Sequence, residues 1–351
     1  MTIRQAHGKK RLLITGGAGF IGINAAEHFI KKGWFVIILD NYSRIGAKDN
    51  IAWLTGNYKG KFEVIVCDIT RDLGKLKNAV TRVSAVLHLA GQVAVTTSVE
   101  NPRDDFERNA LGAFNVLEAI RNSKNRPTLL YSSTNKVYGG LEHEAVVEEK
   151  SRYSFKSLKF GVDETAPLDF HSPYGCSKGT ADQYIRDYAR IYDLDTVVLR
   201  QSCIYGPHQF GIEDQGWVAW FTIASLMDRP VKIYGNGKQV RDVLFVSDLT
   251  NLYDLCLRNI KKVRGEVFNV GGGQKNTMSL IEFMPKLEKI TDKKLSWKFG
   301  KVRPGDQPIF VADTRKAKKL LGWEPRVNID AGLDKLAQWV KDNQKVLKKY
   351  L

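Results

Sequence analysis

The 351-residue chain has no apolar run close to the roughly 20 residues that a membrane-spanning helix needs. Its basic N-terminus, MTIRQAHGKKR, is not followed by an apolar secretory segment with a small-residue cleavage site, and the next apolar run soon ends in glycines. The sequence therefore predicts neither a membrane span nor a signal peptide. On the same ground we expect no membrane partner.

Cysteine and histidine are too scattered for a disulfide framework or a metal centre. The four cysteines (Cys67, Cys176, Cys203 and Cys256) lie far apart and have no CxxC spacing, which is typical of a protein in a reducing cytoplasm. The six histidines show no paired-ligand spacing, so we predict no metal.

Acidic residues are in the minority: 38 Asp and Glu stand against 54 Lys and Arg, a formal net charge of +16. Such a charge is compatible with nucleic-acid binding. The basic residues are spread along the chain, however, with only mild clusters such as Lys261–Arg264, and no nucleic-acid motif is present. We therefore expect no nucleic-acid partner and interpret the charge as a lysine-rich solvated surface, which would also favour an anionic small substrate.

Short apolar runs alternate with helical patterns over the first 200 residues. Nearly unbroken apolar runs predict strands at residues 11–17, 34–40, 61–69, 85–91, 128–133 and 196–200. Helical patterns occur at residues 23–33, 109–123 and 172–192. This alternation predicts an α/β fold with a doubly wound, parallel, Rossmann-like sheet.

The segment ITGGAGFIG follows the first predicted strand and opens a helix. Gly16, Gly19 and Gly22 have GxxGxxG spacing, which would let the backbone turn tightly and approach a pyrophosphate at the helix N-terminus. The second strand ends at Asp40, where a carboxylate would hold the adenosine ribose hydroxyls of NAD and repel the 2′-phosphate of NADP. The alternative is that Asp40 is only a turn or cap residue. Arg44, four residues further on, leaves NADP possible as the cofactor.

These motifs predict two domains with a ligand cleft between them. We expect an NAD-binding Rossmann-like domain over residues 8–200, to which residues 240–275 return. Residues 201–239 and 276–351 should form a smaller mixed α/β substrate-binding cap.

Tyr174 and Lys178 lie four residues apart in HSPYGCSKG, on one face of a predicted helix that starts with Ser-Pro. A nearby ammonium and a cationic nicotinamide would both favour the phenolate, so Tyr174 could remove a proton from a substrate hydroxyl. Alone, such a pair is more often a surface tyrosine and lysine. Thr134 follows a strand end and could hydrogen-bond a reacting sugar oxygen. Taken by itself, this threonine is better explained as a simple strand-end cap.

Together these segments resemble the extended short-chain dehydrogenase/reductase family, and within it the nucleotide-sugar epimerases. The resemblance is carried by TGGAGFIG, Asp40, HLAGQ, SSTNKVYG, YGCSK, RQSCIYGP and the RPGD loop, from about Arg11 to the C-terminal helix. It implies that Tyr174 is the catalytic base, Lys178 its partner and a cofactor ligand, and Thr134 the third catalytic residue.

The resemblance also implies two binding sites. Its NAD ligands would be Gly16, Gly19, Phe20, Ile21, Gly22, Asp40, Asn41, Arg44, Asp68, Ile69, Leu89, Ala90, Gln92, Asn109, Ser132, Tyr174, Lys178 and Gln201. Its substrate contacts would be Thr134, Asn135, Cys203, Gln209, Tyr234, Arg241, Arg303 and Asp306.

The segments DFHSPYGCSKG and RQSCIYGPHQFGIEDQGWVAWF look most like the family members that act on CDP-sugars at C2. The implied reaction is the conversion of CDP-paratose to CDP-tyvelose through a transient 2-keto sugar, a step of lipopolysaccharide O-antigen biosynthesis. A UDP-hexose 4-epimerase or another family epimerase is the alternative. A catalytically silent NAD(H)-binding scaffold is the alternative from a different class.

Two departures from the family pattern narrow the chemistry. Relatives that dehydrate nucleotide sugars carry Asp-Glu directly after the threonine, where this chain has Asn135 and Lys136. Without a carboxylic acid to protonate a leaving hydroxyl, dehydration is disfavoured. Many relatives have asparagine in place of Cys203, which implies a differently lined sugar pocket.

The family commonly pairs through two helices, which implies a homodimer or homotetramer. The face would comprise Asn115–Ile120 and Tyr184–Tyr188, with an apolar stripe of Ala113, Val116, Leu117 and Ile120. Burial of that stripe inside the monomer is the alternative.

Overall fold

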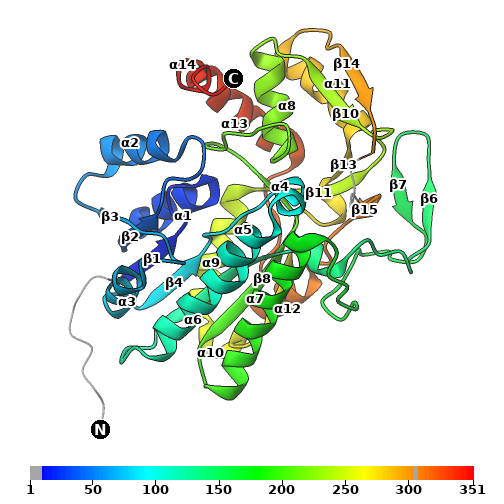
Figure 1. Ribbon diagram of the computed structural model, residues 1–351. Coiled ribbons are helices and arrows are strands. Elements are labelled where there is room, and N and C mark those ends of the chain that lie inside the picture. Colours follow the sequence, from blue (N-terminus) through cyan, green and yellow to red (C-terminus); the bar gives the residue numbers. More distant parts are fainter. Residues whose placement is uncertain (1–9, 303–306) are drawn as a thin grey trace.

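A parallel sheet of seven strands, in the order β12-β8-β5-β4-β1-β2-β3, forms the centre of the computed structural model, which describes residues 10–302 and 307–351 (Figure 1). Its strands are β1 (Arg11–Thr15), β2 (Phe35–Asp40), β3 (Phe62–Val66), β4 (Ala85–His88), β5 (Thr128–Thr134), β8 (Thr196–Gln201) and β12 (Val267–Val270). The strand order reverses direction between β1 and β4, so a crevice forms at their carboxyl ends. The predicted doubly wound parallel sheet is confirmed.

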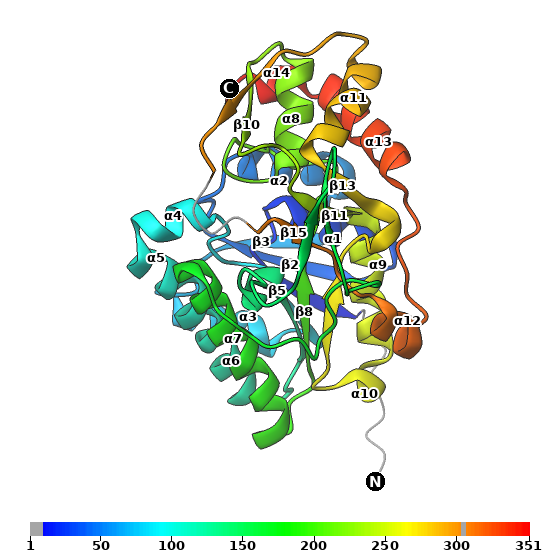
Figure 2. The same ribbon diagram turned by 90° about the vertical axis from the view of Figure 1, so that its right-hand side faces the viewer.

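Helices cover both faces of this sheet, which explains why its inner strands are buried and mostly apolar (Figure 2). One face packs against α1 (Phe20–Lys31) and α9 (Val246–Arg258), and the other against α3 (Leu73–Thr81), α6 (Gly112–Arg121) and α7 (Ser172–Ile191). The predicted helix at residues 109–123 differs at its start, because a π-helical turn, η1 (Glu107–Leu111), precedes α6.

The apolar stripe of α6 faces the sheet. Ala113, Val116, Leu117 and Ile120 are all fully buried in the core of the monomer. The prediction that these four side chains form a self-association face is therefore wrong. Helical periodicity shows that one face of a helix is covered, and it cannot tell a covering sheet from a second subunit.

After β8 the chain builds a second core from smaller sheets and helices. Strands β9 (Cys203–Tyr205), β11 (Val240–Phe245), β13 (Thr277–Ser279) and β15 (Ile309–Phe310) form one sheet, and β10 (Val231–Tyr234) pairs with β14 (Trp297–Gly300). Helices α8 (Trp217–Leu226), α11 (Leu280–Thr291) and α13 (Ile329–Asp342) pack on them. The domain boundaries drawn from the sequence remain a prediction.

The remaining described elements, most of them short, complete the fold. They are α2 (Ala47–Tyr58), α4 (Val95–Glu100), α5 (Pro102–Phe106), η2 (Asn135–Tyr138), β6 (Val146–Glu148), β7 (Tyr153–Phe155), α10 (Ile260–Val263), η3 (Gln274–Asn276), α12 (Arg315–Leu321) and α14 (Gln344–Leu347). Strands β6 and β7 form a hairpin, which Arg152 anchors by donating to both carboxylate oxygens of Glu282 at 2.8 and 2.6 Å. None of the helices in the described part of the chain is long and apolar enough to cross a membrane.

Candidate active site

A cleft of about 390 Å³ opens at the carboxyl ends of the parallel strands, where ligands gather in folds of this kind. It brings together most of the residues predicted to bind the cofactor: Gly16, Gly19, Phe20, Ile21, Gly22, Asp40, Asn41, Arg44, Asp68, Ile69, Leu89, Ala90, Ser132, Tyr174, Lys178 and Gln201. Of the predicted substrate contacts, Thr134, Cys203 and Gln209 also line it.

Five predicted contacts lie outside the lining of this cleft. They are Gln92, Asn109, Asn135, Tyr234 and Arg241. The Asn109 side chain accepts from the Gln92 amide at 2.9 Å, and that of Asn135 donates to Gln307 at 3.0 Å, so both sit in buried networks behind the cleft. The Tyr234 hydroxyl donates to Glu213 at 2.7 Å.

Two further predicted contacts, Arg303 and Asp306, lie outside the described residues. Arg241 does not line the cleft itself but acts on Cys203, which does. Burial raises the pKa of the Cys203 thiol, and the positive charge of Arg241 opposes this rise. Arg241 is therefore close enough to act electrostatically on a side chain of the lining.

The glycine turn after β1 has no room for a side chain at three of its four glycines, Gly16, Gly17 and Gly22. Gly16 has a φ of +70°, and a Cβ on it would lie 2.7 Å from the Ala90 nitrogen. A Cβ on Gly22, in the first turn of α1, would lie 2.5 Å from the Gly16 oxygen. The backbone of the turn can therefore come close to a ligand at the N-terminus of α1.

We predict that Gly22→Ala lowers the free energy of unfolding, because the added methyl group meets backbone that cannot move aside. Overpacking of this kind costs about 1–3 kcal/mol. Gly56→Ala is the matched control: it is also a helical glycine, and nothing lies within 4 Å of its added Cβ. Alanine there should stabilise the protein by up to about 1 kcal/mol. Urea unfolding of both variants tests the contrast, and an equal change in both would contradict it.

Asp40 is held by the turn that it faces. Its carboxylate accepts from the Ala18 amide at 3.0 Å and from the Tyr42 amide at 2.7 Å, and burial raises its pKa. The structural role considered for Asp40 is therefore present, and the carboxylate also lines the cleft. The next strand end is linked to it through Asn41, which donates to Asp68 at 3.0 Å.

Helix α7 carries Tyr174 and Lys178 into the cleft, where both are buried. The Tyr174 hydroxyl is hydrogen-bonded to the Thr134 side chain at the end of β5. The Lys178 ammonium donates to the Ser132 carbonyl at 2.5 Å and lies 4.3 Å from the centre of the Tyr131 ring. Two neighbouring elements, β5 and α7, thus hold the three predicted catalytic side chains.

Burial changes the protonation expected for this group. It raises the pKa of Tyr174 to about 12, which the hydrogen bond from Thr134 only partly offsets. It also lowers the pKa of Lys178 to about 7, although the carboxylates of Asp182 and Asp105 oppose this. Burial thus weakens the positive charge of Lys178 near neutral pH, so the ammonium favours the phenolate less than an exposed lysine would.

Five neighbours of the predicted catalytic side chains were missed in the sequence. Asp182, one turn beyond Lys178, accepts twice from the buried Arg200 guanidinium, at 2.9 Å each, and from the Ser133 hydroxyl at 2.7 Å. The buried carboxylate of Asp105 lies 2.5 Å from the Ser177 hydroxyl. The spacing of Asp182 from Lys178 on one helix was the only sequence signal, and the partners of both Asp182 and Ser177 come from other elements.

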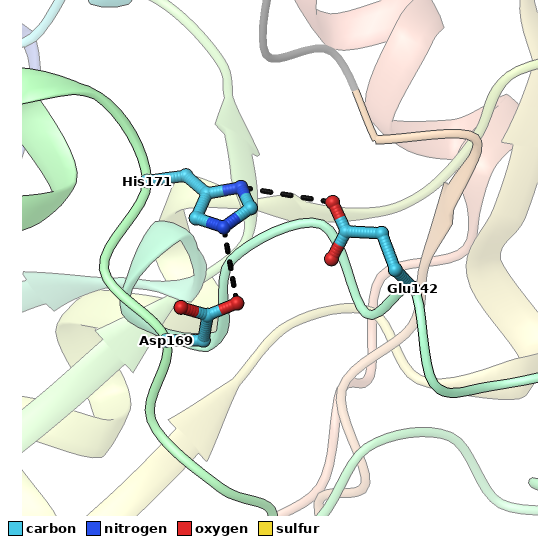
Figure 3. Close-up of side chains that lie close together, drawn as sticks. All are labelled: Glu142, Asp169 and His171. Atoms are coloured by element: carbon cyan, nitrogen blue, oxygen red, sulfur yellow. Dashed lines mark ion pairs between the residues drawn. The ribbon is translucent and has the colours of Figure 1, made fainter.

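Among the described residues, one group could supply three metal ligands: Glu142, Asp169 and His171. Figure 3 shows the His171 ring between the two carboxylates, with Asp169 3.0 Å from Nε2 and Glu142 3.7 Å from Nδ1. Each carboxylate faces a different nitrogen of the imidazole ring, and all three side chains are exposed. The group is therefore better described as a histidine placed between two surface carboxylates. We assign no metal to it.

Comparison with known proteins places this geometry in a family. Residues 13–336 match the GDP-mannose 4,6 dehydratase family. The chain belongs to this family. The resemblance to extended short-chain dehydrogenase/reductases, predicted from the sequence, is confirmed, and the family consists of enzymes that act on nucleotide sugars.

Individual relatives cover almost the whole chain. A CDP-paratose 2-epimerase of Salmonella typhi is 46% identical over 94% of this chain and 98% of its own length. The crystal structure of a UDP-glucose 4-epimerase of Thermotoga maritima with UDP-glucose has a TM-score of 0.81 at 30% identity, covering 95% of this chain and 99% of that one. A UDP-glucuronic acid 4-epimerase of Bacillus cereus, solved with UDP-glucuronic acid and NAD, has a TM-score of 0.81 at 28% identity, with the same coverage.

Proposed function

We propose that the protein is an NAD-dependent epimerase that interconverts CDP-paratose and CDP-tyvelose at C2. The identity of 46% to a CDP-paratose 2-epimerase supports the substrate. The buried hydrogen bond between Tyr174 and Thr134 at the floor of the cleft supports the chemistry, and it is the observation on which the mechanism rests. As part of this proposal the enzyme acts in the cytoplasm.

The cleft suits NAD at three places. The glycine turn leaves backbone, and no side chain, at the N-terminus of α1, where a pyrophosphate would be stabilised. The Asp40 carboxylate stands at the end of β2, where it can accept from ribose hydroxyls. Lys178 and Tyr174 lie further along the same cleft, where the nicotinamide end would reach.

The chain itself supplies binding and proton transfer. NAD⁺ contributes a hydride acceptor and, once reduced, a hydride donor. Tyr174 removes the proton from the C2 hydroxyl and returns it after the sugar has presented its other face. Thr134 holds the Tyr174 hydroxyl and stabilises its deprotonated form.

Dehydration requires an acid that can protonate a departing hydroxyl. The two positions after Thr134 hold Asn135 and Lys136 instead of carboxylic acids, and the Asn135 amide is engaged with Gln307. The side chains around the catalytic group therefore favour epimerisation over the dehydration for which the family is named.

Purified protein should invert C2 of CDP-paratose without added cofactor, because the redox-neutral cycle regenerates NAD. Proton NMR of a panel of CDP- and UDP-sugars measures this. Inversion at C4 of a UDP-hexose, with none at C2 of CDP-paratose, would establish the alternative epimerase. NAD in the denatured extract without any turnover would establish a binding scaffold.

We predict that Asp40→Ala weakens NAD retention, because the ribose hydroxyls lose an acceptor. The same change leaves the Ala18 and Tyr42 amides unpaired, which costs about 1–3 kcal/mol of stability. Asp40→Asn separates the two effects, since the amide keeps one acceptor oxygen. Nucleotide content after denaturation and thermal melting are measured together. Full NAD content in both variants would limit Asp40 to its role in the turn.

We further propose self-association as a homodimer or homotetramer through the outer faces of α6 and α7. Phe114 and Tyr184 are exposed there, with their ring centres 5.9 Å apart. Light scattering at micromolar concentration should give the molar mass of a dimer or tetramer. The double variant Phe114→Ser/Tyr184→Ser should lower this mass towards that of the monomer. A monomeric parent protein would contradict this proposal.

A further inference from the structure

Strand β14 forms an open edge at the periphery of the molecule. It pairs in parallel with β10, and no described strand pairs with its other side. In Figure 1 the strand lies at the upper rim, away from the large sheet. An open edge of this kind exposes both its backbone and its side chains to whatever surface approaches it.

One face of β14 is aromatic and uncovered. Trp297 lies opposite Val231 and Phe299 opposite Ile233, and residues paired in this way share one face of the sheet. Val231 and Ile233 are buried in the second core, whereas Trp297 is 36% and Phe299 60% exposed. Val302, just beyond the strand, is 68% exposed. The apolar face is therefore buried at β10 and exposed to solvent at β14.

Lysines are frequent in the segment that contains β14. Between residues 286 and 302 lysines outnumber acidic residues six to two. Lys293 is paired with Asp228 at 2.6 Å, but Lys294, Lys298 and Lys301 are exposed and have no acidic partner among the described residues. Lys298 shares the opposite face of β14 with Lys232, because successive residues of a strand point to opposite faces. Lys294 and Lys301 lie just before and just after the strand. The open edge thus carries exposed aromatic side chains on one face and has positive charge on its other face and at both ends.

Several partners could cover such a surface, and the charges discriminate between them. A second copy paired edge to edge would bring the lysine-rich strands together, which like-charge repulsion opposes. Single-stranded nucleic acid would satisfy the charge and could stack on Trp297 and Phe299, but Val302 offers no plane for a base. A membrane interface matches all three features, because aromatic and aliphatic side chains enter the headgroup boundary while lysines meet anionic lipids.

We propose that this surface binds the protein peripherally to anionic lipid bilayers. We call it the β14 patch and define it as Lys294, Trp297, Lys298, Phe299, Lys301 and Val302. The earlier expectation of no membrane partner depended on the lack of a long apolar run, and a patch of this kind leaves no such run in a sequence. The patch also gives part of the +16 net charge a role apart from solvation.

Vesicle flotation tests the proposal with the full-length protein. Phosphatidylcholine vesicles containing phosphatidylglycerol should carry the protein at low salt, and vesicles of phosphatidylcholine alone should not. Lys294→Gln/Lys298→Gln/Lys301→Gln should weaken partitioning about 100-fold, or about fivefold for each charge near the surface. Trp297→Ser/Phe299→Ser should weaken it at least tenfold, because the apolar contact is lost.

Matched variants elsewhere on the surface control for general charge and hydrophobicity. Lys77→Gln/Lys124→Gln/Lys262→Gln removes three exposed lysines from other regions. Ile191→Ser/Tyr192→Ser removes apolar side chains that are 66% and 37% exposed, close to the values of Phe299 and Trp297. Both controls should bind vesicles like the parent protein, and thermal melting checks that every variant folds.

Three results would overturn the proposal. The first is no flotation with anionic vesicles at low salt. The second is equal loss of binding in the lysine variant and its control, or full binding by the aromatic variant, since either indicates adsorption by net charge alone. The third is tighter binding to an oligonucleotide, lost in the same patch variants, which would assign the patch to nucleic acid.

Discussion

Tyr174→Phe should lower the turnover number by at least 10²–10⁴-fold, the usual contribution of one general acid–base group. The substitution removes only the hydroxyl that is bonded to Thr134, and the buried ring stays in place. No neighbour can replace this hydroxyl, because the Thr134 hydroxyl is far less acidic and the Lys178 nitrogen is directed to the Ser132 carbonyl. Initial rates measured by NMR, with NAD content in parallel, test this.

The pH profile gives an independent check on the same residue. Burial raises the pKa of Tyr174 to about 12, and a bound cationic nicotinamide would lower it. A base acts in its deprotonated form, so turnover should increase with pH as the phenolate forms. Tyr174→Phe should abolish this increase. Activity above about a tenth of the parent, against the range expected for a general base, would remove Tyr174 from the mechanism.

Lys178 offers a contrasting variant. Burial lowers its pKa to about 7, so it carries a full positive charge only when something nearby favours that charge. Since Lys178 is also proposed to contact the cofactor, Lys178→Met should reduce NAD retention as well as the turnover rate. Tyr174→Phe should reduce the turnover rate alone. The two variants together distinguish the proton-transfer group from the group that holds the cofactor.

The parts of the site that could be predicted are those whose residues lie close together in the sequence. The glycine turn, Asp40 at a strand end and the pair Tyr174 and Lys178 each lie within a single strand-to-helix turn or one helical repeat. Local spacing determines which side chains share a strand end or a helix face, so these residues were brought to one cleft as expected.

The parts that could not be predicted depend on pairs distant in the sequence. Asp105 meets Ser177 across 72 residues, and Ser133 meets Asp182 across 49. No periodicity connects such positions, and a buried aspartate looks like any surface aspartate until its partner is known. The prediction that the apolar stripe of α6 forms a self-association face was wrong for a related reason. The apolar spacing of a helix is the same whether a sheet or a second subunit covers it.

The pair of Asp182 and Arg200 joins the catalytic helix to the sheet. Both side chains are almost completely buried, and two hydrogen bonds of 2.9 Å hold the guanidinium to the carboxylate. Arg200 also donates to the Tyr138 hydroxyl at 2.9 Å, and Ser133, next to Thr134, donates to Asp182. The positions of α7 and of the end of β5 therefore depend on one ion pair.

Asp182→Asn should lower the free energy of unfolding by about 3–5 kcal/mol, because it leaves the buried Arg200 charge uncompensated. Turnover should fall as well, since the amide cannot hold both guanidinium nitrogens and α7 loses its fixed position. Urea unfolding followed by circular dichroism measures the stability, and NMR measures the rate.

Two further variants show whether the isolated charge is the cause. Asp187→Asn, an exposed change on the same helix, should stay within about 0.5 kcal/mol of the parent protein. Asp182→Leu/Arg200→Met removes both charges and should be more stable than Asp182→Asn, because apolar replacement of a buried pair is often neutral. If the double variant were the less stable of the two, the hydrogen bonds to Ser133 and Tyr138 would outweigh the charge, and α7 would be held by that polar network as a whole.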